Sequence, residues 1–192
     1  MEFEKVVFGR RSIRSYTAEP VSDEDLSYIL KAGLHAPSGV DLQPWYFVVV
    51  RSPEQMRKLV DVMGLVSEKI APALKNRFSS HPEVAEESLR FIRRLGGAPI
   101  CILAFWHQPE YPKKEASIIQ SISAAIENML LAAYDRGLGG CWMTAPVGMA
   151  AETTLREQFA PGKGPLVAML TLGHPAAVPE MPARKTGRYT IL

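Results

Sequence analysis

The sequence predicts one domain in which helices cover a central β-sheet, in the α+β or α/β class. Three apolar stretches, residues 45–50, 100–105 and 166–172, have the length and composition of buried strands. Stretches with apolar residues at helical spacing separate them. The 192 residues contain no repeat and no linker that would divide them, so residues 1–192 are expected to form a single domain.

The first part of the chain is predicted to be helical. Residues 3–8 suggest a short helix that offers Phe3, Val6 and Val7 to a core. Ser22 is placed to cap a second helix, which carries apolar residues at helical spacing and which Pro37 ends.

Residues 45–50 are apolar on both faces, so this strand is expected inside the sheet. Ser52 and Pro53 then favour a helix start. Residues 64–95 are hard to assign, with helical pieces at 73–78 and 84–95. Their charges fit either an exposed excursion that covers a ligand or a plain helical hairpin on the surface.

The second half alternates again between strands and helices. Its long helix carries a wide apolar stripe, as expected for a helix buried at a core or an interface. From His174 onward the chain is rich in proline and basic residues, and is expected to be disordered or to cross another surface. The predicted elements are a strand at 100–105, helices at 117–136 and 150–159, and strands at 141–143 and 166–172.

Composition excludes several classes of protein. A net charge of +2 without a long basic run gives no support for a nucleic-acid partner. Cys101 and Cys141 lie in apolar stretches and are expected to be buried thiols, with no spacing that suggests a metal site. The charged start lacks a secretion signal and no apolar run reaches membrane-spanning length, which predicts a cytoplasmic protein.

Three segments have residues that could carry chemistry. Arg10, Arg11, Ser12 and Arg14 place three guanidiniums and a hydroxyl within five residues, which suits a phosphate group as well as a solvated basic turn. Residues 36–45 form a loop whose polar atoms suit a flat ligand, or an ordinary turn-rich connection. Residues 137–146 contain glycines that do not fit the dinucleotide pattern GxGxxG.

Together with Arg184-Lys185, these segments strongly resemble the nitroreductase family. The family pattern has Arg-Arg-Ser-x-Arg, then a Pro-Ser-x-x-Asn-x-Gln-Pro-Trp loop, a Gly-Leu-Gly-x-x-Trp segment and a late Arg-Lys pair. Here these are residues 10–14, 37–45, 137–142 and 184–185, so the resemblance spans nearly the whole chain. It implies an α+β fold with a central mixed, mostly antiparallel sheet flanked by helices, and a swapped C-terminal extension.

The resemblance also implies FMN as cofactor and a homodimer with FMN at its interface. The tail at 174–192 would cross the partner subunit, and residues 64–95 could form a lid. One subunit would hold the phosphate and ribityl chain, the other would line the flavin, and residues at the end of the strand at 141–143 would lie near N5. The implied phosphate and ribityl ligands are Arg10, Arg11, Ser12, Arg14 and Arg184. The residues that would line the flavin from the other subunit are Pro37, Ser38, Gly39, Asp41 and, less strongly, Gln43. Those near N5 would be Met143, Thr144 and Ala145.

Asp41 departs from the family pattern, which has asparagine there. An ionised aspartate can only accept hydrogen bonds. Next to the flavin it would repel negative charge and lower the reduction potential, unless it turns to Arg14 or another cation.

The implied activity is ping-pong reduction of nitroaromatic, quinone or similar electron-poor acceptors with NADH or NADPH. The cofactor carries this chemistry, so no catalytic side chain and no metal is expected. The four histidines are scattered and are expected to be structural or exposed. The alternatives are another flavin chemistry on the same fold, such as dehalogenation, enoate reduction or flavin fragmentation, and a non-enzymatic FMN-binding protein. Positive charge beside the flavin pyrimidine could come from Lys69 or Arg77.

Overall fold

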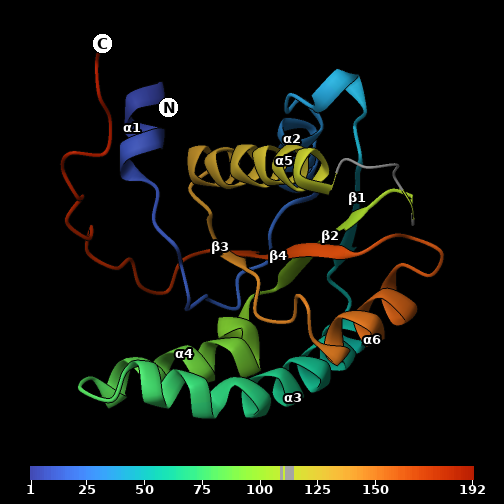
Figure 1. The fold of residues 1–192 in the computed structure, drawn as a ribbon, viewed down its shortest axis with the longest axis vertical. Helices are drawn as coiled ribbons and strands as arrows, with labels where there is room; N and C mark the ends of the chain where they lie inside the picture. The colour runs from blue at the N-terminus through green and yellow to red at the C-terminus, as the bar shows by residue number, and fades with distance from the viewer. Residues whose placement is uncertain (109, 111–114) are drawn as a thin grey trace.

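The chain folds around one antiparallel sheet, seen edge-on in Figure 1. The computed structural model describes residues 1–108, 110 and 115–192. The strand order is β1-β2-β4-β3 and all three pairings are antiparallel. The α+β class with a mostly antiparallel sheet is therefore confirmed, and the one parallel contact between described residues is an isolated bridge from Ser12 to Gly140. The strands are β1 (Trp45–Val50), β2 (Ile100–Trp106), β3 (Gly139–Met143) and β4 (Leu166–Gly173).

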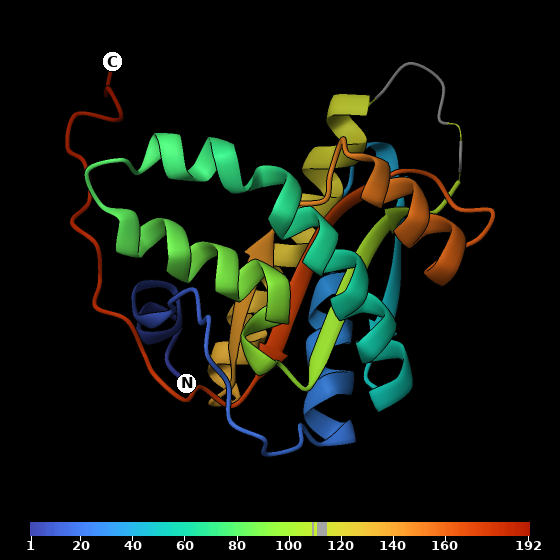
Figure 2. The same ribbon diagram turned by 90° about the horizontal axis from the view of Figure 1, so that it is seen from below.

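Helices cover both faces of the sheet, which gives three layers (Figures 1 and 2). Side chains alternate along a strand, so β2 directs Ile102 into one core and Leu103 into the other. The first core lies under α2 (Asp23–Leu34) and α5 (Glu115–Asp135), and the second under α3 (Pro53–Arg77), α4 (Pro82–Arg94) and α6 (Ala150–Phe159).

The strand β1 lies at an edge of the sheet, so its predicted place inside the sheet is wrong. Its burial is partial, and Tyr46 is 38% exposed. The central strands are β2 and β4, which are buried almost throughout. Aromatic and β-branched residues suit an edge strand as well as a central one, and therefore the apolar run did not reveal the difference.

Residues 53–94 form a helical hairpin, which contains nearly all of the segment at 64–95 that is hard to assign from the sequence. The helix α3 runs for 25 residues, straight through Gly64 and Pro72, and α4 packs beside it. Leu59, Met63 and Val66 are buried against the sheet. This burial outweighs the poor helix propensity of the glycine and the proline.

Two predicted caps are confirmed. The Ser22 hydroxyl accepts a hydrogen bond from the Asp25 amide at 3.0 Å, and the Ser52 hydroxyl accepts one from the Gln55 amide at 3.3 Å. The long helix α5 matches its predicted stripe. By length and composition it could cross a membrane, but its buried residues are shared with the sheet and α2.

The two ends of the chain have apolar residues that are exposed to solvent. The helix α1 (Phe3–Gly9) buries only Val6, while Phe3 is 75% and Val7 is 38% exposed, so the prediction that all three face a core is wrong for Phe3 and Val7. Beyond Pro175 the tail runs extended and exposed past α1 (Figure 1).

Candidate functional site

The arginine segment lies directly against β3, so the fold brings together two of the segments that the sequence singled out. The Ile13 amide donates to the Gly140 carbonyl at 3.0 Å, next to the bridge between Ser12 and Gly140. The approach is close, because a Cβ on Gly139 would come within 2.4 Å of Ile13 Cγ1. Gly139 is thus required for packing at this point.

A buried tyrosine fixes this segment on the sheet. The Tyr16 hydroxyl donates to the Ile13 carbonyl at 2.7 Å and lies 2.8 Å from the Thr171 hydroxyl on β4. Burial raises the pKa of Tyr16, so the phenol stays neutral. The sequence patterns did not single out Tyr16 or Thr171, since their contact joins positions 155 residues apart.

The three arginines of the segment have different surroundings. Arg11 Nη1 donates to the carbonyls of Phe8, Gly9 and Arg10 at 2.7–2.9 Å and so closes the end of α1. Arg10 Nη2 lies 3.2 Å from Glu127 Oε1, while its buried Nε has no partner among the described residues. The Arg14 guanidinium lies over the Phe91 ring at 5.9 Å.

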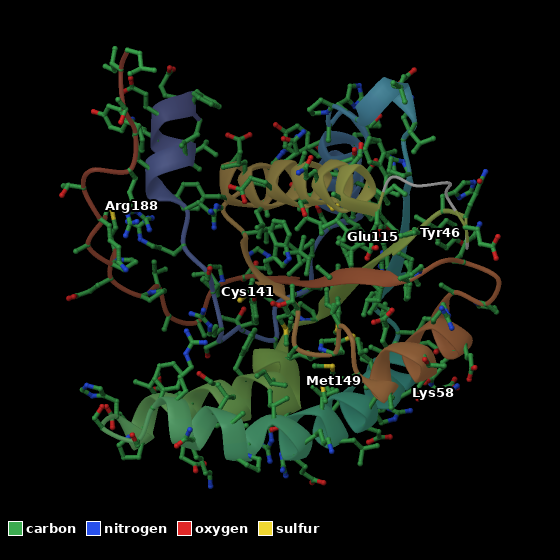
Figure 3. The ribbon with its side chains drawn as sticks, in the orientation of Figure 1. Tyr46, Lys58, Glu115, Cys141, Met149 and Arg188 are labelled. Atoms are coloured by element: carbon green, nitrogen blue, oxygen red, sulfur yellow. The ribbon has the colours of Figure 1, made fainter. Side chains whose placement is uncertain are left out.

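The two cysteines are buried and free, as predicted. Both pair with Thr171, one on each side of β4, so two strand spacings separate them, which is too far for a disulfide. Burial raises the pKa of both thiols, and nearby Arg14 and Arg10 partly offset this effect at Cys141. Figure 3 shows Cys141 in the middle of the molecule. Neither thiol is set up as a nucleophile.

The loop at residues 37–45 lies elsewhere, at the N-terminal end of α5. The Gly39 amide donates to the Ser121 hydroxyl at 3.3 Å. Glu127, which meets Arg10, is six residues further along α5, or about 9 Å at 1.5 Å per residue. Figure 1 likewise shows the end of α2 and the arginine segment on different sides. One chain therefore does not bring this loop to the arginines.

The backbone of this loop is strained and exposed. Val40, Asp41 and Gln43 have φ angles of 49°, 54° and 45°, a left-handed region that side chains rarely adopt. Asp41 Oδ1 accepts from Gln43 Nε2 at 2.9 Å. Within the described chain it pairs with no cation, so the expected alternative of an Asp41–Arg14 pair is not found. Such strain typically marks functional loops.

The remaining predicted residues lie at the other end of β3 and on the tail. Met143 is buried, whereas Thr144 is exposed and begins a turn in which its carbonyl accepts from the Val147 amide at 3.0 Å. The tail starts beside the arginine segment, where the Ala176 amide donates to the Ser15 carbonyl at 2.9 Å. Further along, Arg184 is exposed.

A cavity of about 930 Å³ opens beside Ser12 and Arg14. Its far wall is α4, and the start of the tail forms a third side. Neither Lys69 nor Arg77, the predicted sources of positive charge, lines it; Arg90 and Arg94 do. No group of His, Cys, Asp or Glu side chains in the described ranges could hold a metal ion.

The chain is similar to several known proteins along most of its length. It is 31% identical to an Archaeoglobus fulgidus protein named NADH dehydrogenase/NAD(P)H nitroreductase, over 89% of this chain and 84% of the relative. It is also 31% identical to iodotyrosine deiodinase 1 of Rattus norvegicus, over 96% of this chain and 67% of that protein.

Among solved structures, a nitroreductase from Desulfovibrio desulfuricans in complex with FMN matches with a TM-score of 0.73 and 29% identity, over 97% of this chain and 93% of the other. A BluB-like flavoprotein from Clostridium difficile matches with a TM-score of 0.75 and 28% identity, over 100% and 99%. The family model described as the nitroreductase family matches residues 7–174. The chain therefore belongs to the nitroreductase family.

Proposed function

We propose that the protein is an FMN-dependent oxidoreductase that uses NADH or NADPH to reduce nitroaromatic, quinone or similar electron-poor acceptors. The observation that carries the proposal is the meeting of the arginine segment with β3. There the buried Nε of Arg10 lacks a partner, and Arg14 has no carboxylate partner in the described part of the chain. An anionic ligand that reaches both groups would satisfy them.

These residues fit a flavin mononucleotide. Arg10, Ser12 and Arg14 would hold its phosphate and ribityl chain, and Arg184 would add a second cation from the tail. Arg11 would act indirectly, because its contacts with three carbonyls fix the turn that presents Arg10. Guanidinium groups suit this task, since their forked donors match phosphate oxygens.

When bound, FMN supplies the hydride acceptance and donation that these reactions need. The chain's own residues bind and orient it. Met143, Thr144 and Ala145, at the end of β3, would border the reactive edge of the ring. The neighbouring thiol of Cys141 stays protonated because burial raises its pKa, so it brings no negative charge to the site.

A second copy of the chain would complete the site. We propose a homodimer in which Pro37, Ser38, Gly39, Asp41 and Gln43 of one subunit line the flavin held by the other. Two features support it: the loop is exposed and strained, and it lies apart from the arginines of its own chain. The tail at 174–192 would cross the partner subunit, and the reaction would take place in the cytoplasm.

The test is purification followed by reduction under anaerobic conditions. We expect a yellow protein with one FMN per chain, bleached by NADH or NADPH and reoxidised by a nitroaromatic or a quinone. Arg10→Ala with Arg14→Ala should remove FMN and leave a folded dimer. Arg51→Ala with Arg57→Ala, two exposed arginines away from β3, is the matched control. Retained FMN in the first double variant would contradict the phosphate assignment.

Other chemistry on this fold is the alternative. One named relative is a deiodinase, which favours dehalogenation. A solved structure similar to this chain is a BluB-like flavoprotein, which favours a flavin reaction other than acceptor reduction. Deiodination is supported less well, because a lid that receives a charged aromatic substrate needs aromatic groups and residues 64–95 offer only Phe78 and Phe91. The same preparation tests it with an iodinated acceptor. FMN that neither nucleotide bleaches would favour a non-enzymatic FMN-binding protein.

A further inference from the structure

The cavity beside Arg14 has three walls from distant parts of the chain. The arginine segment forms one, α4 with the turn before it forms the second, and the start of the tail forms the third. At about 930 Å³ it is large enough for a small aromatic molecule. It is lined by residues 12, 14 and 15; 78, 84, 87, 88, 90, 91 and 94; 96 and 97; and 177–179.

The charges around this cavity are unbalanced. Arg14, Arg90 and Arg94 line it, against the single carboxylate of Glu87. Glu87 lies 4.0 Å from Arg90, so these two largely cancel. Across the described residues, Arg14 and Arg94 make no ion pair. The cavity therefore keeps about two positive charges. Arg14 and Ser12 are proposed FMN ligands, so once FMN binds, the Arg94 guanidinium and the Ser88 hydroxyl remain for a second ligand.

A second cavity of about 620 Å³ lies between α3 and α4, and Arg90 and Arg94 line it as well. There Lys75 pairs with Glu86 at 3.0 Å, and Arg93 pairs with Glu68 at 3.4 Å. Charges that compensate each other in this way are typical of a solvated surface. Arg94 has no ion pair among the described residues, and its guanidinium is therefore a free cation that the two cavities share.

The rest of the first cavity's lining suits a flat apolar body. The Phe91 ring is buried and lies under the Arg14 guanidinium at 5.9 Å. Phe78, Val84 and Val178 add apolar surface. A ring that enters beside Phe91 would therefore have apolar contacts along its length and cations at its edge.

On the basis of the proposed function, we infer that this cavity selects the electron acceptor. It favours flat acceptors that carry an anionic group, such as a carboxylate, which Arg94 binds while the ring packs beside Phe91. Of the proposed FMN ligands, Ser12 and Arg14 line the cavity and Arg10 does not, so the cavity adjoins the FMN site. The anionic group of the acceptor would lie at Arg94 on the α4 wall, and the phosphate of FMN at the arginine segment. The competing source of the anionic group is a phosphate of NADPH or NADH.

The test compares 4-nitrobenzoate with 4-nitrobenzamide, which have nearly the same shape but differ in charge. For each, kcat/KM is measured on the FMN-loaded enzyme with saturating NADH or NADPH. Arg94→Gln should lower the ratio of the two values, benzoate over benzamide, about tenfold, as expected for a lost charge-assisted hydrogen bond. Arg94→Lys should retain most of the ratio, because it keeps the charge. Arg93→Gln, one position away and paired with Glu68, is the matched control and should leave the ratio unchanged.

A binding measurement gives an independent readout. Benzoate should bind the oxidised holoenzyme in calorimetry, and Arg94→Gln should weaken it by a similar factor, with benzamide unaffected. An unchanged ratio and unchanged benzoate binding in Arg94→Gln would overturn the inference. So would a rise in KM for NADPH or NADH without a change for 4-nitrobenzoate, which would assign Arg94 to the donor. If neither nucleotide bleaches bound FMN, or neither nitro acceptor nor a quinone reoxidises it, the proposed function itself fails; if both nitro acceptors are reduced with no effect of Arg94, only this inference fails.

Discussion

At the scale of single residues, Tyr16 explains how the arginine segment keeps its position. Its hydroxyl bonds to Ile13 within the segment and to Thr171 on β4. Tyr16→Phe would leave both buried partners without this bond, and we expect a loss of about 1–2 kcal/mol in the free energy of unfolding. Urea unfolding measures it. Tyr189→Phe, on the exposed tail, is the control and should change nothing; an equal loss in both variants would contradict the anchoring role.

The same residue predicts how stability depends on pH. Burial raises the pKa of Tyr16 in the folded state above its unfolded value of about 10. The unfolded chain therefore loses this proton first, so the stabilisation is complete below about pH 10 and declines as the pH rises above it. We expect unfolding free energies to fall less steeply above about pH 10 in Tyr16→Phe than in the parent protein. Parallel curves would argue against a buried phenol.

Asp41 offers a test of whether the loop of one subunit contributes to the flavin site of its partner. If this carboxylate lies near the flavin of the partner subunit, it disfavours added negative charge on the ring. Asp41→Asn should then raise the reduction potential of the bound FMN by about 10–30 mV. The asparagine tolerates the left-handed backbone that Asp41 adopts. A spectroelectrochemical titration measures the shift, and an unchanged potential would remove this loop from the flavin's surroundings.

The residues of the site were predictable only in part. The spacing of Arg10, Ser12 and Arg14 pointed to an anion, because residue types suited to phosphate stood close together in the sequence. Their actual partners were not predictable in the same way. Glu127, which pairs with Arg10, and Thr171, which holds Tyr16, come from positions more than 100 residues away. Single-sequence patterns carry no information about such contacts.

At the scale of elements, the hairpin of α3 and α4 shows where local rules fail. The sequence predicted only helical pieces at 73–78 and 84–95 in this region, yet α3 continues through Gly64 and Pro72. Propensity costs of about 1 kcal/mol for glycine and 3 kcal/mol for proline are smaller than the burial of several large side chains. The sequence predicted the caps and the stripe of α5 correctly, because these signals are local. The edge position of β1 depends on the topology of the whole sheet.

The 3₁₀ turn η1 (Gly39–Asp41) provides a prediction at this scale. Val40 is 80% exposed and has a φ of 49°, which costs a β-branched residue about 1–2 kcal/mol. Glycine removes that cost but loses about 0.5–1 kcal/mol of chain entropy. Val40→Gly should therefore stabilise the protein by about 0.5–1 kcal/mol in thermal or urea unfolding. Val178→Gly, on the exposed tail, should not, and a destabilised Val40→Gly would contradict the strained turn.

At the scale of the whole molecule, both ends of the chain leave large apolar side chains exposed to solvent. Phe3 and Phe8 stand exposed on α1, and the tail presents Tyr189, Ile191 and Leu192 to solvent. In Figure 1 both segments border the same side of the sheet. Exposed apolar groups of this kind mark an interface. The resemblance predicted a swapped tail, and this exposed apolar surface supports that prediction.

The last prediction follows from that surface. Light scattering on the intact protein should give twice the chain mass of 21.2 kDa. Deleting residues 177–192 should shift it toward the monomer and release FMN, because the tail's apolar contacts and Arg184 are lost together. Arg184→Ala separates the two effects: it should weaken FMN binding while the dimer persists, and Arg188→Ala is its control. A truncated chain that stays dimeric and yellow would show that the tail neither holds the subunits together nor contributes to the cofactor site.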